Sequence, residues 1–493
     1  MKKSIYFILL INFILNANAI AQMQDKLWMM GYDCCVPDFT GINMDFRTSS
    51  LIVDSVPRHF NFSDTNGQIC DSIGNPLFFS NGVYVANSLA DTMLNGSGLN
   101  PSTYTSIHNL RGLYIPQANL VIPMPGDNKK YFLFHQTCDD YNNTCAAFYL
   151  YYSIIDMSID SGHGGVTNKN TILLQDTFVT GKLIACKHAN GRDWWLISHK
   201  YDSDSSFRFL ITPYDIQGPF IDNLVTERRN HPGEVMFSTD GSKYAFCDTY
   251  GGLDIWDFDR CTGTFSNLTH INIIDSVGSI GVAFSRNGQF LYVTTIYSAY
   301  QFDLHASNVE MSQIKIADYD GFVNQGFFQT VFYQQLLGPD NKIYINSSSG
   351  VMDYAVINYP DSAGLACDFQ QHSIHLPGYS VSLPNHPNYF LGPIHGSVCD
   401  SLTIDVPPVN TGVQPFYFFP NPAKNVAYIT QNRSELIKSV KIFNSIGQTE
   451  QTEFLSINKD EYLQINLSGL FPGIYFAEIV TDKRVVVRKF LKQ

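Results

Sequence analysis

The sequence predicts an all-β protein, in which a β-propeller of about seven four-stranded blades precedes a small second domain. Only 15% of the 493 residues are charged, whereas 14% are aromatic, and aromatic and β-branched residues favour half-buried strands. Polar turns followed by aromatic strands recur at the spacing of propeller blades. A stretch rich in proline and small polar residues then separates this region from a compact C-terminal segment.

The N-terminus has the features of a secretory signal peptide. The positive pair Lys2-Lys3 precedes the apolar run Ile5–Ile14, which is too short to span a membrane. Small residues around the end of this region favour cleavage after Ala21, so residues 1–21 are the expected signal peptide. We expect no transmembrane segment in the mature chain.

Six polar turns, each followed by an apolar or aromatic strand, define the repeat. They are centred on Gly82, Asn128, Gly191, Gly241, Gly288 and Asn341. The successive steps are 46, 63, 50, 47 and 53 residues, close to the length of a four-stranded blade. Asn-Gly and Asp-Gly tolerate the positive φ angles of tight hairpin turns. We therefore assign residues 22–402 to the propeller, with six blades, eight blades or a sandwich array as alternatives.

A seventh blade could combine segments from both ends of the propeller, Met44–Val56 and Ile374–Ile394. Such a blade would close the ring and remove exposed sheet edges. Two of the turns also follow an apolar strand, within Gly233–Ser238 and Gly281–Ser285. The unit of apolar strand, Ser-x-Asp/Asn-Gly turn and aromatic strand resembles the YVTN and WD40-like repeats of bacterial propellers.

All ten cysteines follow the signal peptide, so an oxidising environment and disulfides are expected. Three pairs are predicted: Cys138–Cys145, Cys247–Cys261 and Cys367–Cys399. Each of the first two would close a short hairpin, and the third would tie down the end of the large domain. The remaining cysteines have no assigned partner: Cys34, Cys35, Cys70 and Cys186. No CxxC pair repeats at zinc spacing, so a cysteine metal site is not expected.

The formal net charge is −13, and lysine and arginine form no cluster. Phosphate binding needs a basic stripe, so we do not expect a nucleic-acid partner.

The C-terminal part separates into a predicted linker, residues 403–416, and a compact domain, residues 417–493. The linker is rich in proline and small polar residues. The domain has its own alternating apolar segments. Strands are expected at Ala427–Thr430, Ser439–Phe443, Tyr462–Leu467, Gly473–Val480 and Arg484–Leu491.

Four sequence blocks follow one another in this domain: PNPA, VKIFN with a nearby glycine, LSGLFPGIY and a terminal KFLK. Their characteristic residues are Pro420, Asn421, Pro422, Gly447, Leu467, Leu470, Gly473, Tyr475, Lys489 and Phe490. In this order they resemble the type A C-terminal sorting domain of Bacteroidota type IX secretion substrates. The resemblance covers Phe419–Gln493. Asn444 stands where aspartate is commoner, but both residues suit the same turn.

This resemblance implies that the C-terminal domain is a small immunoglobulin-like β-sandwich. It also implies that the domain carries folded cargo through the outer-membrane translocon of the type IX system. In this family the domain is commonly removed, and the cargo is released or attached to surface lipopolysaccharide. The expected location is therefore extracellular or at the cell surface. The resemblance assigns no ligand and no reaction to the propeller.

Local motifs give little support for catalysis. No G-x-S-x-G nucleophile elbow occurs, so the glycine-rich loop at residues 162–165 is interpreted as flexible. His372 and His375 would point to opposite faces of a strand, which argues against a shared metal. Asp257 and Asp259 could share a calcium ion, but a turn or an inter-strand hydrogen bond around Trp256-Asp257 is favoured. We expect no catalytic residue, no cofactor and no metal site.

Three classes of function fit these observations. The first is a non-catalytic binding or adhesion propeller with an extracellular protein or glycan as its partner. The second is a hydrolase of carbohydrate or peptide that uses carboxylates in the central channel. The third is a structural component outside the cell. Acidic residues converging in the channel would favour the second class, and a large exposed aromatic patch would favour the first.

Overall fold

The chain divides into two compact units, Met1–Thr403 and Ile404–Gln493. The computed structural model describes residues 22–33, 41–273, 279–400, 416, 418–430, 436–444, 448–450, 454–457, 462–482 and 485–493. The predicted signal peptide, Cys34, Cys35 and Gly447 lie outside the described residues, as does the predicted linker apart from Phe416.

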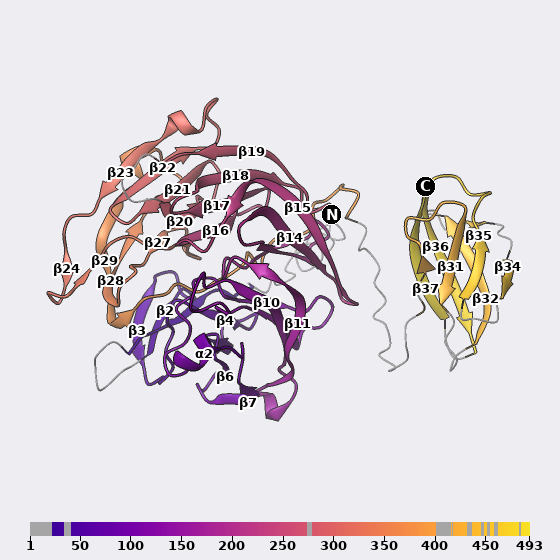
Figure 1. The fold of residues 1–493 in the computed structure, drawn as a ribbon, viewed down its shortest axis with the longest axis horizontal. Helices are drawn as coiled ribbons and strands as arrows, with labels where there is room; N and C mark the ends of the chain where they lie inside the picture. The colour runs from indigo at the N-terminus through magenta and orange to yellow at the C-terminus, as the bar shows by residue number, and fades with distance from the viewer. Residues whose placement is uncertain are drawn as a thin grey trace, which may run out of the picture. The chain divides into compact units, whose positions relative to one another are not determined.

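The first unit is a β-propeller, and its strands follow one another in blades (Figure 1). The first blade has three strands, β1 (Leu27–Met30), β2 (Gly41–Asp45) and β3 (Ile52–Val56). Six four-stranded blades follow. The second blade contains β4 (Gly67–Cys70), β5 (Pro76–Ser80), β6 (Tyr84–Asn87) and β7 (Thr92–Ser97), and the third contains β8 (Asn119–Pro123), β9 (Lys130–His135), β10 (Ala147–Asp156) and β11 (Gly165–Phe178). The fourth contains β12 (Ile184–Lys187), β13 (Trp194–His199), β14 (Ser203–Ile211) and β15 (Ile216–Arg228), and the fifth contains β16 (Gly233–Phe237), β17 (Lys243–Asp248), β18 (Gly252–Phe258) and β19 (Phe265–Ile271). The sixth contains β20 (Ser279–Phe284), β21 (Phe290–Thr295), β22 (Ser298–Asp303) and β23 (Ile314–Asp318), and the seventh contains β26 (Gln335–Leu337), β27 (Ile343–Ile345), β28 (Val351–Ile357) and β29 (Phe369–Ser380). The second and third blades are joined by one parallel pair, Gly165 with Leu94.

Within each four-stranded blade, neighbouring strands are antiparallel, so the loops alternate between two faces of the ring. We call the face that carries the turns between first and second strands the turn face. The opposite face, which carries the connections between blades, is the crossover face. The loops between second and third strands also lie on the crossover face.

An acidic or amide side chain fixes each turn between the first and second strands of a four-stranded blade. Its Oδ1 accepts the backbone N–H two residues further on, at 2.9–3.3 Å. The six residues are Asp71, Asp127, Asn190, Asp240, Asn287 and Asp340. This bond lies within the turn itself and stabilises it, which explains why Asn and Asp recur there.

The turn at Gly82 was assigned to the wrong position in the repeat. It joins β5 to β6, the second and third strands of its blade, and therefore lies on the crossover face. The equivalent of the other five turns is the one fixed by Asp71. Asn81 forms the same kind of bond as the other turn residues, because its Oδ1 accepts the N–H of Val83, two residues further on, at 3.2 Å.

The first and last blades close the ring by side-chain packing. The predicted blade that combined Met44–Val56 with Ile374–Ile394 is wrong, because β1–β3 and β26–β29 are separate sheets. Trp28 of the first blade packs against Tyr344 of the last, with 5.5 Å between their ring centroids. Aromatic packing across a blade boundary therefore closes the ring here without strand exchange.

The innermost strand of the first blade, β1, runs antiparallel to β4. The N–H of Cys70, at the end of β4, donates to the carbonyl of Gln24 before β1, at 3.0 Å. At the other end, Asn66 Nδ2 donates to the carbonyl of Met29 at 3.1 Å. The first blade therefore has no innermost strand that runs in the direction of β4.

Residues 381–394, here called the channel segment, run through the centre of the ring from the crossover face to the turn face. Figure 1 shows this part of the chain in light orange, crossing the middle of the propeller. The N–H of Asn385 donates to the carbonyl of Asn66, just before β4, at 2.9 Å. Further along, Asn388 Nδ2 donates to Thr239 after β16 at 2.7 Å. The N–H of Ile394 donates to Ala189, in the turn after β12, at 2.8 Å.

Asn385 and Gln117 bond to the backbone of the inner strands around the channel. Asn385 Nδ2 donates to the carbonyls of Asn119 and Leu183, at 3.0 and 2.9 Å. Gln117 exchanges two bonds with Val235, accepting its N–H at 3.0 Å and donating to its carbonyl at 2.9 Å. These bonds link the third, fourth and fifth blades to the channel segment, which satisfies backbone groups that water cannot reach.

Glu234 has the same role for the last two blades. Its Oε2 accepts the N–H groups of Val282 in β20 and Gln335 in β26, each at 3.0 Å. Burial raises the pKa of Glu234 to about 8, although both N–H groups act to lower it. The carboxyl is therefore mainly protonated near neutral pH.

The propeller contains two disulfides among its described residues, Cys138–Cys145 and Cys261–Cys399. The first is the expected pair. The predicted pairs Cys247–Cys261 and Cys367–Cys399 are wrong, and Cys247 and Cys367 are buried thiols.

The positions of the cysteines along the fifth blade explain this outcome. Cys247 is opposite Leu253 in the β17–β18 register, near the crossover face. Cys261 follows β18 on the turn face, at the other end of the blade. There it meets Cys399, which follows the channel segment, with 5.7 Å between their Cα atoms.

The second unit contains two four-stranded sheets, ordered β30-β31-β35-β34 and β33-β32-β36-β37. Their strands are β30 (Phe418–Phe419), β31 (Val426–Thr430), β32 (Ile437–Asn444), β33 (Thr449–Glu450), β34 (Phe454–Ile457), β35 (Tyr462–Asn466), β36 (Gly473–Thr481) and β37 (Val485–Lys492). Apolar side chains from both sheets form one core, which makes the unit a β-sandwich. The five predicted strands match β31, β32, β35, β36 and β37, whereas the short strands β30, β33 and β34 were missed.

Glu234 gives a prediction about the pH dependence of stability. In the unfolded chain this carboxyl ionises around its ordinary pKa of 4.5, whereas in the folded protein its pKa is about 8. Each rise in pH across this interval therefore favours the unfolded state. Glu234→Gln keeps an oxygen acceptor but cannot ionise. We expect the variant to gain stability relative to the wild type between pH 5 and pH 8.

Urea unfolding of both proteins at several pH values measures this difference, and the exposed Glu310→Gln serves as the matched control. Parallel pH profiles for wild type and Glu234→Gln would contradict the burial argument.

Candidate functional site

The central channel is filled by the protein's own chain. Around the channel segment there remains a cavity of only about 10 Å³, lined by Gln117, Glu234, Met236, Gln334, Leu336, Leu383, Pro384 and Asn385. This is about the space that one water molecule needs. Glu234 is the carboxyl in this lining, and its Oε2 already bonds to backbone. Among the described residues, this cavity is too small for a sugar or a peptide.

A cluster of aromatic rings lies on the crossover face and is here called the tyrosine cluster. Its members are Tyr32, Tyr104, His108, Tyr114 and Tyr141. The Tyr104 ring lies 4.3 Å from His108 and 5.5 Å from Tyr141, between centroids. The hydroxyls of Tyr32 and Tyr114 are 2.9 Å apart. Tyr141 is 42% exposed, so the cluster presents an aromatic surface to solvent.

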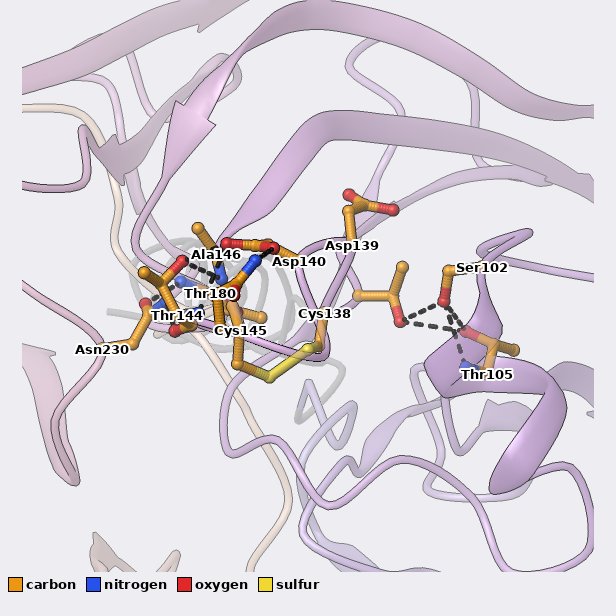
Figure 2. The surroundings of a disulfide bond; sticks show 12 residues. Ser102, Thr105, Cys138, Asp139, Asp140, Thr144, Cys145, Ala146, Thr180 and Asn230 are labelled. Carbon is orange, nitrogen blue, oxygen red and sulfur yellow. Dashed lines mark hydrogen bonds between the residues drawn. A yellow bond between two sulfur atoms is a disulfide. The ribbon is translucent and has the colours of Figure 1, made fainter.

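Helix α2 (Thr103–Ile107) brings Tyr104 into this cluster. The helix begins where Ser102 acts as its N-cap, because Ser102 Oγ accepts the N–H of Thr105 at 3.0 Å. Thr105 Oγ1 is 2.9 Å from Thr137 Oγ1, at the start of the loop that carries Tyr141. Figure 2 shows this contact beside the disulfide.

The Cys138–Cys145 disulfide closes the loop that carries Tyr141. Inside it, Asp140 accepts bonds from Asn143 Nδ2 at 2.7 Å and from Thr144 Oγ1 at 2.8 Å. Outside it, Asn230 Nδ2 donates to the carbonyl of Thr144 at 2.9 Å (Figure 2). The loop is therefore held in one shape by a covalent bond, by its own side chains and by the fourth blade's connection.

Charged groups border the tyrosine cluster. Arg111 pairs with Asp33 at 3.2 Å, and its guanidinium lies 5.9 Å from the Tyr32 ring centroid. Burial raises the pKa of Asp64 to about 7. Burial and then the Asp64 carboxylate raise the pKa of Tyr104 to about 12. The cluster thus combines neutral phenols, one cation and carboxylates, which suits recognition of a polar ligand with an apolar face.

A second aromatic region lies between the sixth and seventh blades. The hairpin of β24 (Val323–Asn324) and β25 (Phe328–Gln329) extends the crossover connection and carries Phe327, which is 84% exposed. At its base, Phe322 stacks on His372 at 4.3 Å between centroids. These rings add to the exposed aromatic surface of the crossover face.

Asp257, His372 and His375 form ordinary ion pairs, whereas Asp259 accepts backbone N–H groups of the following turn. Asp257 bonds to Lys243 on the neighbouring strand at 2.7 Å, so the inter-strand interpretation is confirmed and a shared calcium is not supported. His372 pairs with Asp320 at 2.7 Å and His375 with Asp353 at 2.9 Å. In the described part of the chain, no group of three or more His, Cys, Asp or Glu side chains could hold a metal ion.

The tryptophans that stand out in the sequence belong to the core, whereas the exposed aromatic rings of the crossover face were not predicted from sequence. Trp194, Trp195 and Trp256 are all buried. The tyrosine cluster comes from three connections that lie far apart in sequence, so no local motif marks it. The one local signal was the Cys138–Cys145 pair, which indicated a fixed loop but not what the loop presents.

The motif residues of the second unit fall into two groups. The segment Pro420, Asn421, Pro422 is fastened to the last strand, because Asn421 Oδ1 accepts the N–H of Leu491 at 2.8 Å. The other group contributes to the buried core and consists of Leu467, Leu470, Tyr475 and Phe490. Lys489 is exposed on β37.

Gly473 does not need the conformational freedom of glycine. It begins β36, and its φ lies outside the left-handed region. A Cβ at this position would meet only the Tyr475 ring, at 3.7 Å, which is an ordinary contact. A side chain at position 473 would therefore not obstruct the backbone.

Solved structures with a similar chain course are distant in sequence. A protein from Lactobacillus plantarum is 12% identical with a TM-score of 0.43, covering 73% of this chain and 99% of its own. A putative 6-phosphogluconolactonase from Bacteroides fragilis is 10% identical with a TM-score of 0.41, covering 73% and 98%. One from Bacteroides uniformis is 12% identical with a TM-score of 0.39, covering 72% and 98%. No curated protein sequence matches the chain.

The second unit carries the clear family relation. Across the described stretches of both units, no helix is long and apolar enough to cross a membrane. Residues 417–493 match the family described as the secretion system C-terminal sorting domain, which implies recognition by the type IX secretion system of Bacteroidota and hence export to the cell surface or beyond.

Proposed function

We propose that this chain is a non-catalytic binding protein, exported by type IX secretion, that holds an extracellular glycan or protein on the crossover face of its propeller. The observation that carries the proposal is the contrast between the central channel and the crossover face. The channel, where a hydrolase would need its carboxylates, is occupied by residues 381–394 and retains about 10 Å³. The crossover face instead presents exposed aromatic rings on rigid connections.

The tyrosine cluster and the disulfide loop provide the main binding surface in this proposal. Exposed tyrosines lose little conformational entropy when they bind and combine an apolar ring with a polar hydroxyl. The Cys138–Cys145 bond fixes the loop that carries Tyr141, so little order must be created on binding.

The route of export completes the proposal. Residues 1–21 act as the signal peptide, residues 22–402 as the cargo, residues 403–416 as the linker and residues 417–493 as the sorting domain. The sandwich would be immunoglobulin-like, and the blades would be of the YVTN or WD40-like type. The outer face of β37 is a reasonable contact for the translocon, since Val485, Val487 and Leu491 are exposed there.

Export should depend on the second unit and hardly on the propeller. Deleting residues 417–493 should leave the propeller in the periplasm, and adding residues 1–21 and 417–493 to an unrelated protein should direct that protein to the surface. Phe490→Ala should also reduce export, because this buried ring stacks on Phe418 at 4.2 Å. We expect it to destabilise the sandwich by about 3–5 kcal/mol.

Gly473→Ala is the matched control, since a Cβ fits there, and it should leave export unchanged. Cell fractionation with immunoblotting measures each outcome. Normal secretion of the deleted chain would contradict the sorting assignment.

Binding should depend on the crossover face. Tyr141→Ala removes an exposed ring from the tyrosine cluster, and we expect at least a fivefold loss of affinity. Tyr214→Ala is the matched control, because Tyr214 is an exposed tyrosine in the β14–β15 turn on the opposite face. Surface plasmon resonance of the mature chain over immobilised polysaccharides and secreted proteins measures both. The proposal would be overturned by hydrolysis of any of these, or by binding that only Tyr214→Ala weakens.

A further inference from the structure

A groove of about 450 Å³ opens beside the disulfide loop, where β10 begins and β11 ends. It is lined by Phe148, Tyr149, Gln175, Asp176 and Thr177. The groove is shallow and open to solvent rather than enclosed. Because β10 begins and β11 ends on the crossover face, the groove shares that face with the tyrosine cluster.

The aromatic wall of the groove is fixed by packing. Tyr149 and Gln175 are opposite one another in the β10–β11 register, so their side chains emerge on the same face of the sheet. The Tyr149 ring lies 5.4 Å from Tyr151, which stacks at 5.6 Å on the buried His135. Tyr149 is therefore the outermost ring of a row that is anchored in the core.

The loop side of the groove is fixed as well. The N–H of Phe148 donates to Asp139 Oδ2, inside the disulfide loop, at 2.7 Å. The Phe148 ring is 39% exposed. The backbone of Phe148 and the ring of Tyr149 are thus held in set positions, so little order must be created there when a ligand enters.

The polar wall carries little net charge. Lys200 Nζ donates to Asp176 Oδ2 at 3.0 Å, so the one carboxylate in the lining is paired with a cation. Asp176 Oδ1 also accepts the N–H of Thr177 at 2.7 Å. Gln175 adds an exposed amide and Thr177 a hydroxyl. The groove therefore offers hydrogen-bonding groups without the single-sign charge that favours ionic ligands.

A peptide added as an extra strand fits this place less well. Such a peptide needs an open sheet edge, but the carbonyl of Thr177 already accepts the N–H of Tyr201 at 2.9 Å. Phe178 and Lys200 form a further bridge to the fourth blade. The edge of β11 is thus occupied where it borders the groove.

We infer that this groove binds a neutral pyranose ring of an oligosaccharide, an inference that rests on the proposed binding function. One face of a pyranose presents C–H groups, which carry partial positive charge and suit the negative face of an aromatic ring. Its rim presents hydroxyls, which suit Asp176, Gln175 and Thr177 as partners. Ring stacking together with paired polar groups favours a neutral sugar as the ligand.

The test uses the mature full chain and an array of neutral oligosaccharides, followed by isothermal titration calorimetry with the best array member. Tyr149→Ala should weaken binding at least tenfold, because it removes the stacking ring. Tyr149→Phe keeps the ring and should bind within threefold of the wild type. Gln175→Ala should weaken binding by about threefold to tenfold, as expected for loss of one hydrogen bond. Tyr214→Ala is again the control on the opposite face, and thermal unfolding checks that each variant is folded.

The results separate this inference from the proposed function. Binding that is lost in Tyr149→Ala and kept in Tyr149→Phe supports both. Binding to proteins only, or oligosaccharide binding that Tyr141→Ala abolishes while Tyr149→Ala does not change it, overturns the groove and leaves the binding function standing. Absence of binding to every oligosaccharide and every protein overturns both.

Discussion

The architecture of the propeller depends on how the inner strands satisfy their backbone groups around the channel. Backbone N–H and C=O groups that face the middle of a ring cannot all reach water, and leaving one unpaired costs about 1–3 kcal/mol. Asn385, Gln117 and Glu234 bond to these groups in blade after blade. One of the three lies on the channel segment, so the segment is part of what holds the inner strands together.

This arrangement decides where the protein can meet a ligand. A channel filled by its own chain cannot admit substrate, so recognition must use the outer faces. Side-chain bonds hold the turns between first and second strands on the turn face, whereas the crossover face carries α2, the disulfide loop and the β24–β25 hairpin. The Cys261–Cys399 bond adds a covalent anchor where the channel segment leaves the ring. The ring can therefore stay closed even when the chain beyond Cys399 is removed.

Much of the fold was accessible from sequence, because it rests on local chemistry. Five of the six predicted turns occupy equivalent places in their blades, since Asp or Asn at the turn forms a bond two residues away. The Gly82 turn was given the wrong place in its blade, because Asn81 makes the same bond in the turn between the second and third strands. Ring closure, the Cys261–Cys399 pair and the tyrosine cluster could not be predicted in this way. Each joins residues from distant connections, and their proximity is set by the direction of strands rather than by spacing in the chain.

The central claim is that residues 381–394 occupy the channel as a permanent part of the propeller. Hydrogen exchange of the mature protein, followed by mass spectrometry of peptides from this segment, tests it most directly. The N–H groups of Asn385 and Ile394 bond to Asn66 and Ala189, so peptides containing them should exchange as slowly as those from the inner strands β8 and β12. Exchange at the rate of exposed loops would mean that the channel opens, and it would restore a channel site for catalysis.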